Sequence, residues 1–427
     1  MKAGGAPQSS VTPLLLRHAQ AALGELLSFS RPADQTLSQY FRNHRQLGQR
    51  DRAFVAETTF AVLRRRRSLE AAAGSNVPRD LVIAALVRVQ GLSGRALEGA
   101  IRAEEHALVA RCKAARVETF APAIQADLPD WLWQLLAAEH GAEEGMRIAR
   151  SLLEPAPLDL RVNLVKIERA AALAQLAARG IAGAPTPYSP AGIRLRGKPP
   201  INRDPLFLEG AIEVQDEGSQ VLAYLLAPRR GEMVADFCAG AGGKTLALAM
   251  LMHGSGRLYA MDVSAKRLAE LAPRAARAAL SNVHPIVLAG EADVRAKRLA
   301  GKIDRVLVDA PCSGFGTLRR NPDLKWRHGP EAVAELAQKQ LRILTAAAKL
   351  VKPGGRLVYA TCSILAEENE RVAERFLSSS PEFAPLSCVA LLAAQRIPLE
   401  AGEQLRLWPH LHGTDGFFAA AFERRAA

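Results

Sequence analysis

Two of the five cysteines follow segments with the character of buried strands. Cys312 stands in the run DAPCSG (309–314), and Cys362 stands in the run TCS (361–363). A cysteine taken alone is more often a small buried apolar side chain than a nucleophile. Two cysteines at the ends of parallel strands would share one crevice, and a thiolate is a strong nucleophile. The pair therefore indicates thiol chemistry at one edge of a sheet.

A glycine-rich loop follows an earlier predicted strand of the same region. The strand 233–238 leads into CAGAGGKT (238–245), where glycine lets the backbone turn tightly and approach a ligand closely. Asp262 ends the next predicted strand, where an acid can bind both hydroxyls of a ribose. We therefore predict a cofactor site formed by Asp262 and by the loop residues Cys238, Ala239, Gly240, Ala241, Gly242, Gly243 and Lys244.

Three cofactors compete for this loop. A P-loop needs a glycine where Cys238 stands, and a dinucleotide fingerprint needs a glycine where Thr245 stands. S-adenosylmethionine needs only a close loop, a ribose acid and an adenine pocket, so it fits best.

Pyrimidine chemistry explains why a methyltransferase would need thiols. C5 of cytosine or uracil is not nucleophilic, but attack of a thiolate on C6 produces an enamine that reacts at C5. An acid at N3 would assist, and Asp309 is the candidate. The C5 proton must then leave so that the thiol can depart, and a second cysteine could promote that step.

The region from about residue 211 to residue 425 alternates predicted strands and helices, which is typical of a doubly wound, Rossmann-like α/β sheet. Its ligands are expected beyond the carboxyl ends of the strands. A late strand at 416–422 is expected to be antiparallel at the sheet edge. The other predicted strands are 233–238, 257–261, 285–288, 305–309 and 356–360, and the helices are 245–252, 265–280 and 331–350, the last followed by a turn at KPGG (352–355).

Two smaller regions precede this one. Residues 11–154 read as helical, with apolar residues at helical spacing in 14–29, 51–73, 81–90 and 132–150. Residues 155–210 predict a small α+β module with a strand at 158–164 and a helix at 168–179. Arg64–Arg67 are read either as a solvated face or as an RNA contact. The basic loop 319–325 is read as a holder for a substrate strand, with Trp326 either stacking on a base or packing in the loop.

Composition limits the class of protein. The chain has 427 residues, a formal net charge of +13 and a pI of about 9.9, which favours polyanionic partners such as nucleic acid. The sequence shows no signal peptide and no apolar run near the roughly 18–20 residues of a membrane span. Without a CxxC pair, disulfides and structural zinc are not expected, and a reducing cytoplasm fits. His410 and His412 read as a surface turn rather than metal ligands, and we expect a monomer.

Five stretches together resemble the Sun family of RNA (cytosine-5-)-methyltransferases, especially its bacterial type B enzymes for small-subunit ribosomal RNA. LRVN (160–163) resembles the small domain that precedes the catalytic domain in this family. Residues 37–63 resemble the NusB-like RNA-binding bundle of the type B enzymes. The five stretches are EVQDEGSQ (213–220), CAGAGGKT (238–245), DAPCSG (309–314), TCS (361–363) with EEN (367–369), and GTDGFF (413–418).

The resemblance implies roles for the site residues. Cys362 would be the C6 nucleophile and Cys312 would assist product release. Asp309, Asp262 and the loop 238–244 would bind S-adenosylmethionine, with Asp309 also near the cytosine ring. Lys244 is alternatively a structural residue at a helix start.

The chain departs from the family pattern at two places. Ala241 stands where the family usually has proline, so the loop is expected to be less rigid. GEAD (290–293) offers two acids where the family usually has one directly after glycine. We prefer Asp293 to Glu291 as the adenine-side contact, and the alternative is that neither touches the donor.

Ribosomal RNA or a pre-ribosomal particle is the substrate that the resemblance implies, with 16S rRNA first. A transfer-RNA or DNA cytosine methyltransferase is an alternative, although DNA enzymes use the Pro-Cys cysteine as nucleophile. A non-catalytic RNA-binding assembly factor is a third possibility, and the intact thiols and donor loop argue against it.

Overall fold

The computed structural model describes residues 11–400 and 402–426. The chain forms two compact units. The helical unit comprises the chain up to Glu154 and a later segment, Leu318–Pro330. The α/β unit comprises Pro155–Thr317 and the chain from Glu331 onward. No sequence pattern marked Leu318–Pro330 as part of the helical unit.

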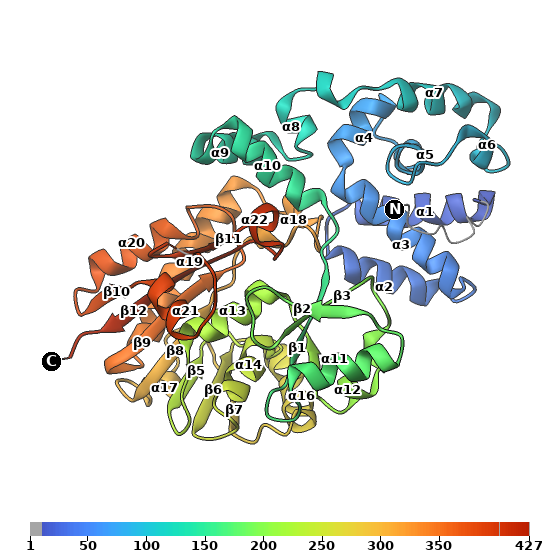
Figure 1. The fold of residues 1–427 in the computed structure, drawn as a ribbon. Helices are drawn as coiled ribbons and strands as arrows, with labels where there is room; N and C mark the ends of the chain where they lie inside the picture. Colours follow the sequence, from blue (N-terminus) through green and yellow to red (C-terminus); the bar gives the residue numbers. More distant parts are fainter. Residues whose placement is uncertain (1–10, 401, 427) are drawn as a thin grey trace. The chain divides into compact units, whose positions relative to one another are not determined.

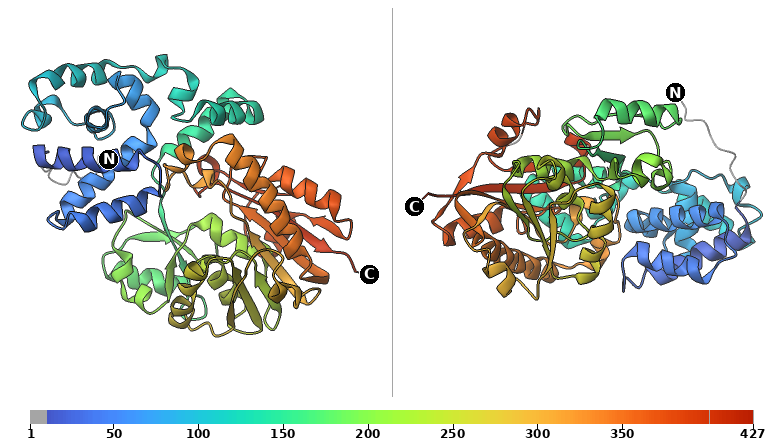
Figure 2. Two further views of the ribbon diagram at one scale, coloured as in Figure 1. Left: turned by 180° about the vertical axis from the view of Figure 1, so that it is seen from behind. Right: turned by 90° about the horizontal axis from the view of Figure 1, so that it is seen from below.

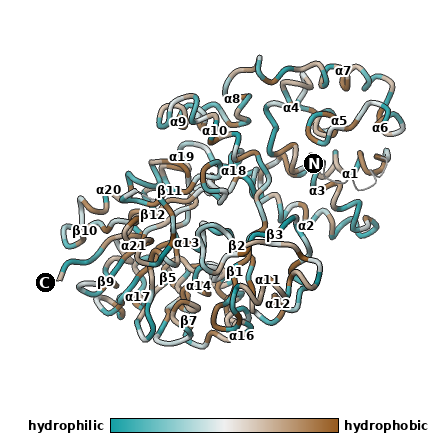
Figure 3. Tube along the Cα trace, in the orientation of Figure 1, coloured by the Kyte–Doolittle hydropathy of each residue, from teal (hydrophilic) through white to brown (hydrophobic). Residues whose placement is uncertain are grey.

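The helical unit is built around α5 (Pro78–Arg88), which packs against α1, α3, α4 and α7. Seven consecutive residues of α5, from Leu81 to Val87, are buried, and Figure 3 shows this helix as hydrophobic. A helix that is apolar all round must lie inside a core. The other helices are α1 (Pro13–Leu26), α2 (Ala33–Asn43), α3 (Gln49–Arg64), α4 (Arg66–Ala73), α6 (Gly94–Leu97), α7 (His106–Ala114), α8 (Pro122–Gln125), α9 (Asp130–His140), α10 (Ala142–Leu153) and, from the later segment, α18 (Leu324–Arg327).

Three predicted helices are each divided in two in the structure, so the predicted lengths were wrong. The helix predicted at 51–73 breaks at Arg65, whose φ of −121° is not helical. The helix predicted at 132–150 breaks at Gly141, whose φ of +79° lies in the region that glycine adopts without strain. The helix predicted at 265–280 forms α15 (Ala265–Ala269) and α16 (Leu271–Arg277). Proline fits the first turn of a helix but not its interior, so Pro273 explains the restart.

The α/β unit begins with a small four-stranded antiparallel sheet in the order β2-β3-β1-β4. The predicted strand and helix are confirmed as β1 (Leu158–Val162) and α11 (Arg169–Ala178). The remaining strands are β2 (Gly183–Pro185), β3 (Gly192–Leu195) and β4 (Ile212–Val214).

A larger, eight-stranded sheet forms the rest of the unit, in the order β10-β12-β9-β8-β5-β6-β7, with β11 paired to β12. Strands β5 to β9 are mutually parallel, and the strand order changes direction between β5 and β8. Ligands of doubly wound sheets bind at such a switch point, beyond the carboxyl ends of the strands. The strands are β5 (Met233–Asp236), β6 (Arg257–Asp262), β7 (Val283–Val287), β8 (Ile303–Asp309), β9 (Val351–Thr361), β10 (Phe383–Leu386), β11 (Leu405–Leu407) and β12 (Phe417–Arg424).

Helices cover both faces of this sheet (Figure 1). One core packs α13 (Glu217–Leu226), α14 (Gly243–Leu251), α16 and α21 (Cys388–Ala394) against one face. The other core packs α19 (Pro330–Ala348) and α20 (Glu370–Ser379) against the opposite face, and Figure 2 shows these orange helices in the view from behind. Successive residues of a strand face opposite sides, so the two cores divide neighbours such as Val358 and Tyr359. None of the described helices combines the length and apolar character needed to cross a membrane.

Two sheet predictions needed correction. The late strand β12 is antiparallel to β9, as predicted, but it is not the edge, because β10 and β11 pair with its other side. The residues KPGG (352–355), predicted as a turn, belong to β9, where the register with β8 shifts between Ile303 and Arg305. This irregularity accommodates the extra residues without ending the strand.

Candidate active site

The two cysteines meet at the carboxyl ends of neighbouring strands. Cys312 follows β8, Cys362 follows β9, and the two strands pair in parallel. The Sγ atoms lie 3.4 Å apart, and both thiols are free and half-buried. The contact with Cys362, together with burial, holds the pKa of the Cys312 thiol well above its ordinary value. Two thiols this close do not both ionise readily, because the charge on one opposes the charge on the other.

The glycine-rich loop 238–244, called the donor loop below, has a backbone conformation that favours glycine at two positions. Gly240 and Gly242 have φ values of +56° and +89°. A Cβ on Gly242 would stand 2.2 Å from Cδ1 of Leu271, so even alanine would force the Leu271 side chain to move. The loop leads directly into α14, whose first residue is Gly243. Its backbone is therefore fixed beside the carboxyl end of β5.

Asp262 holds this loop from the next strand. Its Oδ2 accepts a hydrogen bond from the Gly240 N–H at 2.7 Å, and its Oδ1 accepts one from Ser264 N–H at 2.7 Å. Each carboxylate oxygen carries two lone pairs, so one acceptor site on each oxygen is left for another donor. The predicted spacing of loop and acid thus gives direct contact.

Lys244 links the donor loop to Asp309, three residues before Cys312. Its Nζ donates to Oδ2 of Asp309 at 2.7 Å and lies 5.5 Å from the ring centre of Phe417. Burial disfavours the ammonium, but the Asp309 carboxylate outweighs burial and raises the pKa of Lys244. Negative charge on Cys362 also raises it, so the ammonium lies within electrostatic reach of that thiol.

Asp236 is a buried acid that the sequence analysis did not select. It ends β5, and its Oδ2 accepts a hydrogen bond from the Thr245 hydroxyl at 2.7 Å. Among the described residues, its Oδ1 is buried with no hydrogen-bond partner. Burial raises the pKa of Asp236 to about 7, and the charge on Asp309 acts in the same direction. Its position directly before the glycine loop was a signal that could have been used.

Two arginines, also missed, hold the carbonyl groups of the donor loop. Arg161 of β1 donates to Gly243 O at 2.8 Å, and Arg274 of α16 donates to Ala241 O at 2.5 Å. Burial lowers the pKa of Arg161 to about 10. The LRVN motif (160–163) signalled that Arg161 mattered, but nothing local indicated what it would touch.

The acids after β7 lie in different settings. Both oxygens of Asp293 are occupied, because its carboxylate caps α17 (Val294–Lys297), accepts from Ala289 N–H and pairs with Arg295. The hydrogen bond from Arg295 is the main reason that the pKa of Asp293 falls well below its usual range. Glu291 pairs with Arg342 at 3.2 Å.

Three other residues singled out in the sequence, Cys238, His412 and Trp326, pack against or form hydrogen bonds with neighbouring parts of the fold. Cys238 packs against the sheet core, and burial raises the pKa of its thiol. His412 lies in the short helix α22 (Pro409–His412), where its Nδ1 accepts from Trp408 N–H at 2.9 Å. Trp326 donates from Nε1 to Leu63 O at 2.8 Å within the helical unit, which supports packing, one of its two predicted alternatives. Within residues 11–400 and 402–426, no cluster of His, Cys, Asp or Glu side chains could hold a metal ion.

Family models match most of the α/β unit. Residues 223–423 match the model described as 16S rRNA methyltransferase RsmB/F, and residues 128–202 match the ferredoxin-like domain of RsmF/B-like methyltransferases. A protein named probable ribosomal RNA small subunit methyltransferase B from Synechocystis is 36% identical over 304 residues, which are 70% of this chain and 67% of that one. The chain belongs to the RsmB/F family of 16S rRNA methyltransferases.

Other relatives in the family carry the same kind of name. The probable ribosomal RNA small subunit methyltransferase B of Bacillus subtilis is 37% identical over 70% of this chain. The protein named ribosomal RNA small subunit methyltransferase B from Salmonella typhi is 36% identical over 68% of this chain. The matched segments span 66% and 65% of those two relatives, slightly under two thirds of their lengths.

Several solved structures share the fold of this chain. The crystal structure of PH0851 covers 97% of this chain with a TM-score of 0.78 and 27% identity. A methyltransferase homologue from Pyrococcus horikoshii covers 71% of this chain and 97% of its own length, with a TM-score of 0.61 and 30% identity. NSun6 from the same organism, solved with SFG, shares the fold at 21% identity and a TM-score of 0.62. The α/β unit therefore has the fold of an S-adenosylmethionine-dependent methyltransferase.

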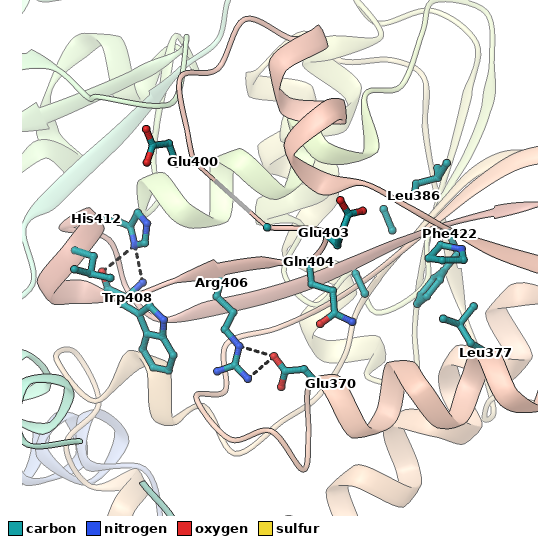
Figure 4. Close-up of a pocket in the computed structure, with 15 residues that line it drawn as sticks. Glu370, Leu377, Leu386, Glu400, Glu403, Gln404, Arg406, Trp408, His412 and Phe422 are labelled. Atoms are coloured by element: carbon teal, nitrogen blue, oxygen red, sulfur yellow. Dashed lines mark hydrogen bonds and ion pairs between the residues drawn. The ribbon is translucent and has the colours of Figure 1, made fainter. Parts of the chain in front are cut away.

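A hollow away from the cysteines lies where β10 and β11 meet β12 (Figure 4). It encloses about 600 Å³ beside the ion pair between Glu370 and Arg406, and Leu386 and Phe422 form part of its apolar wall. Neither cysteine nor any residue of the donor loop lines it. This RsmB/F chain therefore has its candidate chemistry at the strand ends and not in this hollow.

Proposed function

We propose that this protein methylates C5 of cytosine in ribosomal RNA, with 16S rRNA as the substrate, using S-adenosylmethionine as the methyl donor. The observation that carries the proposal is the pair of thiols 3.4 Å apart at the carboxyl ends of β8 and β9. The lysine of the glycine loop, Lys244, pairs with Asp309 at the end of β8. A methyl-donor loop alone fits many methyltransferases. Two adjacent thiols fit a reaction in which one sulfur forms a bond to carbon and a second group helps to break it.

Asp262 and the glycine-rich loop suit S-adenosylmethionine, which supplies an electrophilic methyl group when bound. Asp262 has one free acceptor site on each oxygen, which suits the two hydroxyls of a ribose. Glycine at positions 240, 242 and 243 leaves this part of the loop without side chains, which would allow the donor to lie close to the backbone, and NSun6, which shares the fold, was solved with SFG. Direct contact between Asp293 and the donor stays a prediction, with Glu291 as its alternative.

Each cysteine takes a distinct step in the proposed reaction. The Cys362 thiolate forms a bond to C6, the C5–C6 pair shifts to C4–C5, and the C4–N3 pair moves to N3. N3 takes up a proton through Asp309, whose carboxylate receives it from the hydrogen-bonded Lys244 ammonium. C5 then bonds to the methyl group as the methyl–sulfur bond of the donor breaks, S-adenosylhomocysteine leaves with the electron pair, and N3 returns its proton by way of Asp309. The proton at C5 leaves to a base with the assistance of Cys312, the C5–C6 double bond reforms, and the bond between Cys362 and C6 breaks.

Substrate class is inferred from the relatives and from charge. The curated relatives are named ribosomal RNA small subunit methyltransferases, which favours ribosomal RNA over the alternative, transfer RNA. A net charge of +13 suits a polyanion. We propose that the NusB-like helical unit binds RNA, that the protein acts as a cytoplasmic monomer, and that an assembly-factor role without catalysis is the alternative to exclude.

Bisulfite sequencing of ribosomal RNA tests the proposal. RNA from a strain lacking this gene should lose one or more 5-methylcytosines in 16S rRNA, and expression of the chain should restore them. Purified protein should bind S-adenosylmethionine in calorimetry and transfer labelled methyl groups to unmodified 16S rRNA. Loss of a cytosine mark in transfer RNA alone would support the alternative substrate, and donor binding without transfer to any RNA would support the assembly factor.

A further inference from the structure

Glu368 is a fully buried carboxylate directly behind the two thiols. Its side chain is 0% exposed and takes part in four hydrogen bonds. Oε1 accepts from Ser313 N–H at 2.8 Å and from Gln340 Nε2 at 2.9 Å. Oε2 accepts from the hydroxyls of Ser313 and Ser363, both at 2.5 Å. Both oxygens therefore have their acceptor sites filled by donors from three separate segments.

The partners of Glu368 place it between the cysteine loops. Ser313 directly follows Cys312, and Ser363 directly follows Cys362. The two serine hydroxyls also lie 3.2 Å from each other. One carboxylate thus joins two loops that are 50 residues apart in the chain.

A second group of hydrogen bonds fixes Glu368 itself. Gln340 of α19 donates from Nε2 to Pro311 O at 3.0 Å as well as to the Glu368 carboxylate. The hydroxyl of Tyr359 donates to Glu368 O at 2.5 Å. The carboxylate of Glu368 is therefore held from α19 and its main-chain carbonyl from β9, and Gln340 links the carboxylate to the residue before Cys312.

Burying a carboxylate costs free energy unless hydrogen bonds replace its water, and apolar packing often gives more stability at such a site. The four donors meet that requirement. The negative charge of Glu368 also contributes to the raised pKa of Cys312, after the contact with Cys362 and burial. Glu368 thus acts on the thiols through geometry and through charge.

We propose that Glu368 is a positioning residue that holds the Cys312 and Cys362 loops together, so that both sulfurs reach the same cytosine ring. This inference rests on the proposed function, because it assigns a purpose to the distance between the thiols. Glu368 does not touch the reacting atoms itself. It acts through Ser313 and Ser363.

Oxidation by diamide measures the distance between the thiols without RNA or methyl donor. Cys312 and Cys362 each lose a proton and together lose two electrons as an S–S bond forms, and diamide takes up both to become the hydrazine. The variants are Glu368→Ala and Glu368→Gln, and the control is Glu367→Gln. Glu367 is the half-buried neighbour whose carboxylate takes no part in the network. Mass spectrometry follows the disulfide, and thermal melting identifies variants that keep the fold.

We expect the rate of disulfide formation to fall by different amounts in the variants. Wild type and Glu367→Gln should form the disulfide at the same rate, and Glu368→Ala should be at least about tenfold slower, because small misplacements of reacting groups cost large factors in rate. Glu368→Gln keeps the size of the side chain but removes its charge, so it should be slowed less. In Glu368→Gln the alkylation of Cys312 should also shift to lower pH, which a purely structural role would not produce. If Glu368→Ala fails to fold, Glu368→Gln decides the question by the same two measurements.

Methylation assays complete the test. A folded Glu368→Ala or Glu368→Gln variant should lose kcat while keeping its affinity for S-adenosylmethionine. Wild-type rates of disulfide formation and methylation in a folded Glu368 variant would overturn the inference and leave the proposed function intact. If the wild-type protein methylates no RNA, the proposed function fails, whereas the diamide measurement still decides whether Glu368 sets the distance between the sulfurs.

Discussion

The loops that carry Cys312 and Cys362 begin alike and then differ. Each follows a parallel strand, each places a serine after its cysteine, and both serines donate to Glu368. The ammonium of Lys244 lies within electrostatic reach of Cys362, whereas negative charge on Cys362 and on Glu368 adds to the raised pKa of Cys312. A nearby anion favours the neutral form of a thiol, as at Cys312. Similar local sequences thus acquire different chemistry from their surroundings.

The chain also continues differently after each cysteine. Beyond Cys362 it stays in the α/β unit and enters α20. Beyond Cys312 it enters the segment Leu318–Pro330 of the helical unit. There Lys325 donates to Arg64 O at 2.8 Å and to Asp127 O at 2.7 Å, and Asp323 accepts from Ala33 N–H at 3.2 Å. The Cys312 loop is therefore covalently continuous with an anchored element of the other unit, and the Cys362 loop is not.

The sharpest test of the difference between the loops is removal of Cys362. Cys362→Ala should lower methylation by at least about a thousandfold and abolish the covalent RNA adduct, because the nucleophile is lost. A filter assay with labelled methyl donor and a denaturing gel measure the two effects. Cys388→Ala is the control in the same unit, since burial raises the pKa of Cys388 to about 11 and keeps that thiol neutral. Persistence of the adduct in Cys362→Ala would reverse the assignment.

Removal of Cys312 should impair release of the RNA and not formation of the covalent bond. Cys312→Ala should form the bond between Cys362 and C6 but release it slowly, so that turnover falls and protein bound covalently to RNA accumulates. A shifted band on a denaturing gel that disappears after ribonuclease treatment measures the adduct. Equal trapping by the Cys312 and Cys362 variants would mean that the loops are not specialised.

Replacement of Lys244 tests the cation on the Cys362 side. Lys244→Met should lower kcat by roughly ten- to a hundredfold, because the ammonium within electrostatic reach of Cys362 is lost and Asp309 is left without its partner. Lys244→Arg keeps the charge and should recover part of the rate. Calorimetry with S-adenosylmethionine separates this effect from weaker donor binding. If both variants lose the same amount, the role of Lys244 is steric and not electrostatic.

The pH dependence of alkylation tests the coupling between the thiols. Contact with Cys362 is the first cause of the raised pKa of Cys312. Removing that side chain in Cys362→Ala should therefore lower the pKa, and Cys312 should react with iodoacetamide at lower pH than in wild type. Mass spectrometry of the Cys312 peptide follows the rate, with the Cys388 peptide as an internal control. An unchanged pH profile would show that burial and the charge of Glu368, and not the contact with Cys362, raise the pKa of Cys312.

The smallest effect concerns the helical unit beyond the Cys312 loop. Burial lowers the pKa of Lys325 to about 7, from 10.5 in the unfolded chain. Between these values the unfolded chain binds more protons, so this lysine makes stability rise with pH from about 7 to about 10.5. Lys325→Met should remove that slope without changing the diamide rate of the cysteine pair.

Tryptophan fluorescence during urea unfolding follows the effect of Lys325, since Trp131, Trp133 and Trp326 belong to the helical unit. Lys349→Met is the exposed control in the other unit. A slope that persists in Lys325→Met would assign the pH dependence to another group. A slower diamide reaction would show that the segment Leu318–Pro330 helps to hold the Cys312 loop.

Elements with a strong local signal were predictable. Alternating apolar segments and turns predicted the doubly wound sheet, and the predicted strand 257–261 matches β6 to within one residue at its end. Breaks at Arg65, Gly141 and Glu270 were missed because apolar spacing continues across them. The position of β12 inside the sheet was missed because β10 and β11 are short and depend on pairing with β12.

The sequence by itself determined the chemistry that is available: two thiols at strand ends, a glycine loop, and an acid one strand away. These are properties of short stretches, and local backbone preferences and side-chain types suffice to read them. Only the tertiary structure decided the distance of 3.4 Å between the thiols, the carboxylate of Glu368 behind them and the anchoring of Lys325 in the helical unit. Each of these joins residues at least 50 positions apart, and buried hydrogen bonds of that span form only when packing excludes water from both partners.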